Sequence, residues 1–343
     1  DVLTVHGAGT ARHANCVCVG GNLVLPIGPS LSVARRSAPH VVLPATCSAI
    51  ITAVAALENG RLLVTGDADG RIRIFTGEGK EIPCTKPACC GTLVQELHLI
   101  AEDTPTTSLL AVGDDGACRR IEISHDAASA SIILIMDCTD PASGHGSNVK
   151  FAAVHPKKST VHTIEKDGAA STVTFKLVGW NMLCAPAAVL GSLVLPLPPG
   201  DDPTALALSV ATGTIAVVSR KKTLLLVDAA SMAVVSATTV SCSGTVRHLA
   251  AWDPAVPGAP PAFVGAGDDG VLRLWSAVDG APIAALRMAE AHRPSSTDGA
   301  PMSGNVVTFV GTDALDPRAL WVVEDGAFSL RWCGTPSTDD EAA

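Results

Sequence analysis

A short segment with the residue pattern of a β-hairpin places the strongest constraint on how this chain folds. Residues 263–276 read Phe-Val-Gly-Ala-Gly-Asp-Asp-Gly-Val-Leu-Arg-Leu-Trp-Ser, with an apolar run on each side of Asp269-Gly270. An Asp-Gly pair readily supplies the positive φ angles of a two-residue turn. In the second run two leucines alternate with valine, arginine and tryptophan, which is the period of a half-buried strand. The segment therefore predicts a β-hairpin.

The same hairpin pattern recurs along the whole chain. Residues 64–75 and 321–332 are further copies, residues 110–121 and 164–177 are weaker ones, and residues 213–228 carry a basic turn in place of the acidic one. The turns are anchored at Gly28, Gly70, Gly116, Gly168, about residue 221, Gly270 and Gly326, which lie 42 to 56 residues apart. A period of about 40 to 50 residues with four short strands per repeat is typical of a β-propeller.

The predicted fold is all-β: a seven-bladed β-propeller with four antiparallel strands per blade. The last repeat ends near Trp332 without a fourth strand, so we expect the N-terminal strand, residues 1–7, to complete blade seven. That pairing closes the ring and removes exposed sheet edges. We expect a single domain over residues 1–335 and an acidic tail at 336–343. The expected blades cover residues 14–43, 50–84, 93–137, 148–190, 204–239, 245–287 and 305–332.

The hairpins at 64–75 and 263–276 resemble the second-to-third-strand hairpin of WD40 repeats. The resemblance extends over essentially the whole chain, strongly in three repeats and in degenerate form in four. The Gly-His pair that the family carries before each first strand is absent from nearly every repeat. The family's third-strand aromatic is expected only at Phe75, Trp275 and Trp332. The Asp-His-Ser/Thr-Trp hydrogen-bond tetrad that the resemblance implies is therefore incomplete in most blades, and packed apolar strands must supply most of the stability.

Composition excludes several classes of partner. The net charge of -9 disfavours binding to nucleic acid, because a phosphate backbone would be repelled, and aromatic residues make up only 3% of the chain. The longest apolar runs are far shorter than the roughly 20 residues of a membrane span, so we expect no direct membrane contact. Eleven cysteines without regular spacing and no Asn-X-Ser/Thr site indicate a reducing compartment, intracellular and either cytoplasmic or nuclear.

No motif in the sequence predicts a cofactor, a metal site or catalytic residues. Residues 77–80 (Gly-Glu-Gly-Lys) lack the earlier glycine, the Ser/Thr and the helix of a phosphate-binding loop. Cys16 and Cys18 share one strand face, but a structural zinc needs a second matching pair, which is not visible for them or for the cysteines at 84–90. We expect buried thiols.

The repeated acids are predicted to be structural, because Asp and Asn bind the backbone of their own turn. The turn residues are Asp69, Gly70, Asp115, Gly116, Asp269, Gly270, Asp325 and Gly326.

A few residues are candidates for binding a partner. Lys221 and Lys222, within the basic turn Arg220-Lys221-Lys222, form either a solvated turn or a docking point for an acidic partner segment. Arg247 and the 288–304 loop, with His292 and Arg293, are expected on the same face.

Trp180 is expected at a turn, where a large aromatic residue either anchors an interface or packs against its own blade.

The function predicted is a non-catalytic WD40-like scaffold that binds other proteins or peptides as a subunit of a larger intracellular complex. One alternative is a regulator, an exchange factor, of a small GTPase in vesicle-coat assembly, with a membrane anchor beyond the propeller. A second alternative is an enzyme whose site lines the central channel, because the fold alone does not decide the function.

Overall fold

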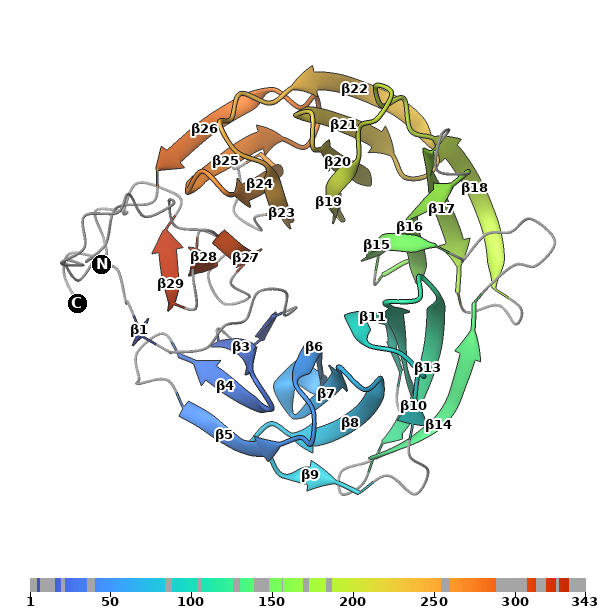
Figure 1. The fold of residues 1–343 in the computed structure, drawn as a ribbon, viewed down its shortest axis with the longest axis vertical. Helices are drawn as coiled ribbons and strands as arrows, with labels where there is room; N and C mark the ends of the chain where they lie inside the picture. The colour runs from blue at the N-terminus through green and yellow to red at the C-terminus, as the bar shows by residue number, and fades with distance from the viewer. Residues whose placement is uncertain are drawn as a thin grey trace.

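Seven antiparallel sheets are arranged in a ring around a central axis in the computed structural model (Figure 1). The structure describes residues 5–6, 16–19, 22–35, 41–83, 88–103, 106–125, 130–138, 148–155, 157–168, 173–182, 187–253, 260–287, 307–312, 319–324 and 327–332. These residues contain the strands β1 to β29 and one short 3-10 turn, η1 (Glu58–Gly60). The seven-bladed, all-β prediction is confirmed in the described part of the chain.

Each sheet is one blade, and the strands follow the chain from the centre of the ring to its rim. Blade 1 is β2 (Val17–Val19), β3 (Asn22–Ile27), β4 (Ser30–Ala34) and β5 (Val41–Thr46). Blade 2 is β6 (Ile51–Leu57), β7 (Leu62–Asp67), β8 (Arg71–Thr76), β9 (Glu81–Ile82) and β10 (Ala88–Cys89). Blade 3 is β11 (Val94–Asp103), β12 (Thr106–Gly113), β13 (Cys118–His125) and β14 (Ala130–Asp137).

The remaining blades repeat this order. Blade 4 is β15 (Val149–His155), β16 (Thr160–Asp167), β17 (Thr174–Asn181) and β18 (Ala188–Val194). Blade 5 is β19 (Pro203–Ser209), β20 (Thr214–Ser219), β21 (Thr223–Asp228) and β22 (Ala233–Thr239). Blade 6 is β23 (Val246–Trp252), β24 (Ala262–Gly267), β25 (Val271–Ser276) and β26 (Pro282–Arg287). Blade 7 is β27 (Val307–Thr312), β28 (Ala319–Glu324) and β29 (Ala327–Trp332), completed by β1 (Val5–His6).

The ring is closed by the two ends of the chain. β1 pairs antiparallel with β29, with Val5 opposite Phe328 and His6 opposite Ala327. The predicted closing strand is therefore confirmed, although it is shorter than expected in the described residues. These paired residues are more than three hundred positions apart in the sequence. The pairing therefore joins the first described segment to the last blade and completes the sheet of that blade.

The fourth strand of blade 2 differs from the prediction. Four strands were expected within residues 50–84, but the outer position is shared by β9 and β10, which each pair separately with β8, and β10 lies beyond residue 84. Pro83 follows β9 directly and has no N–H with which to continue the ladder, which accounts for the interruption.

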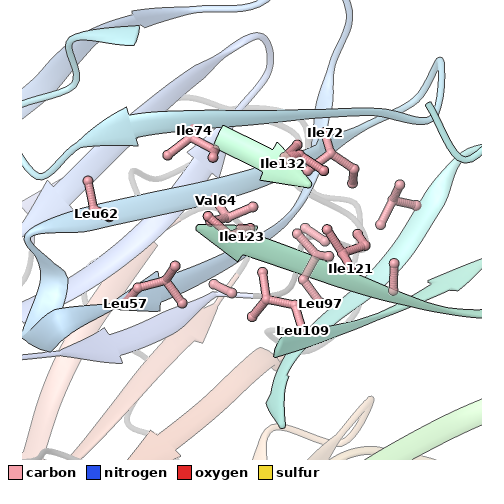
Figure 2. Close-up of a cluster of buried hydrophobic side chains, with 14 of the residues drawn as sticks. Leu57, Leu62, Val64, Ile72, Ile74, Leu97, Leu109, Ile121, Ile123 and Ile132 are labelled. Atoms are coloured by element: carbon pink, nitrogen blue, oxygen red, sulfur yellow. The ribbon is translucent and has the colours of Figure 1, made fainter. Parts of the chain in front are cut away.

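The core lies between neighbouring blades, because both faces of each sheet are covered. Figure 2 shows one such layer between blades 2 and 3, where aliphatic side chains of the two sheets interdigitate. Its members include Leu57, Leu62, Val64, Ile72, Ile74, Leu97, Leu109, Ile121, Ile123 and Ile132. Strands that are buried on both faces need apolar residues at consecutive positions, which explains why β7, β20 and β24 are buried along their whole length.

Antiparallel order places two kinds of segment on one face of the ring. One is the turn between the second and third strands of each blade, and the other is the connection that leads into each blade. We call this face the turn face. Backbone hydrogen bonds join these segments: Ala68 N–H donates to Ile50 O (2.9 Å), and Asp268 N–H donates to Thr245 O (3.1 Å). The connection into blade 5 lies beside its turn in the same way, since Arg220 N–H donates to Asp202 O (2.7 Å), whereas residues 288–304 lie outside the described residues. Among the described residues, no helix is long and apolar enough to cross a membrane.

Candidate partner-binding site

The Asp-Gly turns on the turn face have the structural role expected of them. Gly70, Gly116 and Gly270 all have positive φ, between 63° and 79°. Asp115 Oδ1 accepts a hydrogen bond from Ala117 N–H (3.1 Å), and Asp269 Oδ1 accepts one from Val271 N–H (3.2 Å). Asp325 and Gly326 lie outside the described residues.

In blade 2 the carboxylate of Asp67, another of the repeated acids predicted to be structural, binds the turn. It accepts from the N–H groups of Asp69 (3.0 Å) and Arg71 (2.9 Å).

In blades 3 and 6 an arginine four residues after the turn aspartate neutralises the aspartate's charge. Arg273 donates through both terminal nitrogens to Asp269 (2.9 and 2.6 Å), and Arg119 binds Asp115 in the same way (3.2 and 2.6 Å). Burial alone would raise the pKa of Asp269, but the hydrogen bonds and charge of Arg273 outweigh it and lower that pKa to about 2. These acids are therefore paired within their own hairpin and are not free to bind a ligand.

Trp180 is not at a turn, so that prediction was wrong. It lies in β17 opposite Val161, as Trp275 lies opposite Phe263 in blade 6, and it is fully buried. Its Nε1–H donates to Thr163 Oγ1 (2.9 Å), which in turn donates to Glu165 Oε1 (3.0 Å).

Trp180 is therefore a third-strand aromatic that the sequence analysis missed, because β17 begins later after its turn than the matching strands do. A side chain with no exposed surface cannot anchor a partner in this conformation, so the packing alternative holds.

The basic turn of blade 5 differs chemically from its acidic counterparts. Lys222 has a φ of 70°, and Ser219 Oγ accepts from Thr223 N–H (3.1 Å), a role that aspartate fills elsewhere. The carboxylate that does bind this turn comes from the connection between blades, since Asp201 Oδ1 accepts from Lys221 N–H (2.8 Å). With no acid of its own, the turn has one ion pair among the described residues, between Arg220 and Asp202 of the connection.

The two lysines of this turn do not have the same freedom. The ammonium of Lys222 donates to Cys242 O and is half-buried. Lys221 is exposed, and its ammonium donates to Pro199 O (2.6 Å). Both interactions are with neutral carbonyl groups, so neither charge is neutralised.

Further cations from blade 4 lie beside this turn. The ammonium of Lys150 is 5.2 Å from the centre of the Phe175 ring. Burial lowers the pKa of Lys150, Asp202 raises it, and the positive charges of Arg220 and Lys166 lower it further. Since such effects require proximity, these groups share one region of the turn face.

We call Lys150, Lys166, Arg220 and Lys221 the blade 4–5 basic patch. The carboxylate of Asp202 is 3.7 Å from Arg220, and that of Asp201 binds the backbone N–H of Lys221. Within the described part of the chain, no carboxylate lies within 4.0 Å of the ammonium of Lys150, Lys166 or Lys221.

Lys150 and Lys166 were missed in the sequence because they lie on two different strands of blade 4. An alignment of the blades on their first strands would have placed Lys150 near the turn face. The four basic residues of the patch are nevertheless spread over 72 positions of the chain, from 150 to 221, so they do not form a basic cluster in the sequence.

Arg247, another predicted partner-binding residue, does not join this patch. Arg247 lies at the start of β23 in blade 6 and is 55% exposed, and its Nε–H donates to Asp268 Oδ1 (2.5 Å). Its charge is therefore partly neutralised by the acidic turn of its own blade. His292 and Arg293 lie outside the described residues, so their roles stay predictions.

The described residues include no group of three or more His, Cys, Asp or Glu side chains that could hold a metal ion. Seven cysteines among the described residues are not in disulfide bonds: Cys16, Cys18, Cys47, Cys90, Cys118, Cys138 and Cys242. Burial raises the pKa of Cys16 to about 12 and that of Cys138 to about 11. These thiols therefore stay protonated at neutral pH and behave as small apolar side chains.

Comparison with known proteins supports the fold. No family model and no curated protein sequence matches this chain. Among solved structures, it is similar to a chain in the crystal structure of the mitotic checkpoint complex, with a TM-score of 0.65 and 14% sequence identity. The match covers 97% of this chain and 90% of that chain. At this identity the likeness shows the fold alone, which is a β-propeller.

Proposed function

We propose that this protein is a non-catalytic scaffold that binds an acidic segment of a partner protein on the blade 4–5 basic patch. The solved structure that it resembles contains a propeller within a multi-protein complex, which is consistent with a scaffold role. The fold leaves the blade interiors filled with packed side chains, so binding falls to the loops and turns.

The observation that carries the proposal is the concentration of uncompensated positive charge on an acidic protein. The chain has a net charge of -9, and its turn aspartates in blades 3 and 6 are neutralised by their own arginines. The patch has four cations, and two carboxylates lie beside it among the described residues, those of Asp202 and of the buried Asp201. An acidic segment would complement it and would be steered toward it by the local field.

Charge reversal tests the proposal. The triple variant Lys150→Glu, Lys166→Glu and Lys221→Glu is compared with the double variant Lys157→Glu and Lys158→Glu. The two control lysines are exposed, belong to the same blade and follow β15 on the opposite face of the ring.

Tagged proteins are purified from the source cells and the bound proteins are identified and quantified. We expect the triple variant to lose one or more partners that the wild type and the control retain, and that binding to weaken as salt concentration rises. Circular dichroism of each variant establishes that the ring is folded. Retention of every partner by a folded triple variant would contradict the proposal.

A further inference from the structure

Two buried histidines lie on the side of blade 4 that faces blade 5. His155 ends β15 and His162 lies in β16, and the two residues are 4% and 3% exposed. His162 is opposite Ala153, which lies two positions before His155, so the three side chains point to the same face of the sheet. Ala153 belongs to the core layer between blades 4 and 5. Both imidazoles are therefore enclosed between these neighbouring blades (Figure 1).

A segment of blade 5 covers the imidazole of His162. This segment, residues 228–232, joins β21 to β22 on the face opposite the turn face, and we call it the blade 5 cap. Ala229 O is 3.3 Å from His162 Nε2. Because a carbonyl oxygen only accepts hydrogen bonds, Nε2 carries the proton of the neutral imidazole and Nδ1 carries none. Nδ1 is buried and has no hydrogen-bond partner among the described residues.

Met232 packs the blade 5 cap against blade 4. Gly179 of β17 is opposite both His162 and Gly191 of β18. A Cβ at Gly179 would lie 3.7 Å from Met232 Sδ, and a Cβ at Gly191 would lie 3.2 Å from Met232 Cγ. The thioether side chain therefore occupies the space that side chains at these two glycines would fill, directly beside the imidazole.

The charged groups that face the two imidazoles are mostly positive. They are Lys157 and Lys158 in the turn after β15, Asp228 in the cap, and the other imidazole of the pair. Burial lowers the pKa of His162, the hydrogen bond to Ala229 O raises it, and the charge of His155 lowers it. Burial and the two lysines also lower the pKa of His155. Both imidazoles are therefore uncharged at neutral pH.

The acid of the cap does not compensate a charge on His162. Asp228 Oδ1 accepts from the N–H (2.7 Å) and the hydroxyl (2.6 Å) of Ser231, within its own turn. In the described part of the chain, the histidines that lie within 4.0 Å of a carboxylate are His98 and His125. A proton bound at Nδ1 of His162 would therefore place a charge in the seam without a carboxylate beside it, which is costly.

We propose that the blade 5 cap is a pH-sensitive contact, which undocks from blade 4 when His162 and His155 take up protons while the ring itself stays closed. Ala229 and Met232 lie at the edge of the core layer and are only partly buried, so the cap can move without opening the centre of that layer. This inference goes beyond the scaffold role and does not depend on it.

The direction of the pH response follows from proton linkage. Undocking exposes the imidazoles to water, where their charged form is stabilised, so the undocked state binds protons more readily than the docked state. Docking is therefore strongest above pH 6.5, the usual pKa of histidine, and weakens as pH falls below it. Between about pH 7.5 and about pH 5.5, the ratio of undocked to docked protein should rise by up to about tenfold for each histidine.

The test follows the Met232 methyl group by NMR in protein with isotope-labelled methionine methyl groups. A neutral, soluble paramagnetic compound broadens the methyl signals that solvent can reach, and the signal missing from Met232→Leu assigns Met232. We expect this signal to broaden more strongly at about pH 5.5 than at about pH 7.5. Met182 of blade 4 is fully buried, so its signal should stay sharp at both pH values and report that the ring is closed.

His162→Gln should abolish the pH response, because a glutamine amide can donate to Ala229 O but cannot take up a proton. The matched control is His125→Gln. His125 is also 3% exposed, but it has Glu58 beside it and lies away from the cap, so this variant should respond as the wild type does.

A second measurement does not depend on the folding of His162→Gln. Met232→Ala weakens the docked state, so by linkage the pKa of His162 measured by NMR titration should rise towards 6.5. Val235→Ala, at a 52% exposed position of β22, should leave that pKa unchanged.

Four results would overturn the proposal. They are equal broadening of Met232 at the two pH values in the wild type, a response that persists in a folded His162→Gln variant, Met182 broadening together with Met232, and a His162 pKa that is the same in wild type and Met232→Ala.

Discussion

The Asp269–Arg273 pair allows the contribution of one turn to stability to be calculated from the structure. The two side chains are 7% and 10% exposed, and their contact is bidentate. The pKa of Asp269 is lowered from 3.8 to about 2, and each pKa unit corresponds to about 1.4 kcal/mol. The carboxylate therefore contributes about 2 kcal/mol to the free energy of unfolding at neutral pH. Asp269→Asn should remove about that amount.

The pH dependence of this contribution has a definite sign. Between pH 3.8 and about 2 the unfolded chain binds a proton at Asp269 while the folded protein does not, so stability rises with pH in this range. The contribution is complete above pH 3.8 and is lost as pH falls to about 2. The difference in unfolding free energy between wild type and Asp269→Asn should thus be about 2 kcal/mol at pH 7 and shrink towards zero near pH 2.

Urea denaturation of both proteins over this pH range measures the difference. Asp115→Asn is the control, because Asp115 makes the same contact with Arg119 but its side chain is 39% exposed, where solvent screens the pair. We expect a smaller loss in the control. An Asp269→Asn variant that loses no more stability than Asp115→Asn, or whose deficit is the same at pH 2 and pH 7, would refute the reasoning.

Three further predictions concern single side chains. Gly116→Ala should lower the free energy of unfolding by about 2 to 3 kcal/mol, because the new Cβ would lie 2.7 Å from Asn148 Cα and the backbone φ is 74°. Gly213→Ala is the control: its φ is 67° but nothing lies within 4 Å of the new Cβ, so the loss measured by thermal denaturation should be about 1 kcal/mol. Burial lowers the pKa of His162 below 6.5, so the wild type should lose stability as pH falls below 6.5, and a His162→Gln variant should lose less. Trp180→Phe should cost about 1 to 3 kcal/mol in urea denaturation, because it leaves the Thr163 hydroxyl without its buried donor; an unchanged midpoint would contradict this.

The architecture was predictable because its determinants are local and repeated. Positions such as Gly70 and Gly270 need a positive φ, which glycine adopts without strain. In the adjoining strands, residue types alternate with a period of two, which fits a β-strand and not a helix. Closure by the N-terminal segment followed from counting strands, and the pairing of His6 with Ala327 bears it out.

The candidate site was much less predictable, because it depends on where separate strands meet. Lys150 and Lys221 are 71 positions apart, and their common location follows only from the packing of blade 4 against blade 5. Trp180 was misplaced because it lies 12 positions after Gly168, whereas Trp275 lies only 5 positions after Gly270, so counting from the turn glycine did not reach the matching position.

The location of the basic patch follows from how the repeat neutralises its own charge. Where the hairpin keeps Asp-Gly-X-X-Arg, as in blades 3 and 6, the arginine pairs with the turn aspartate and neutralises its charge. In blade 5 the turn has lost its aspartate, and among the described residues no carboxylate lies within 4.0 Å of the ammonium of Lys150 or Lys166 in blade 4, whereas Lys176 pairs with Asp167. Net charge on the turn face therefore accumulates where the repeat is least regular. The regular hairpins neutralise their own turn aspartates through ion pairs, whereas the irregular hairpins of blades 4 and 5 keep unpaired positive charges. A charged partner is therefore expected to bind at blades 4 and 5 and not at the best-preserved hairpins.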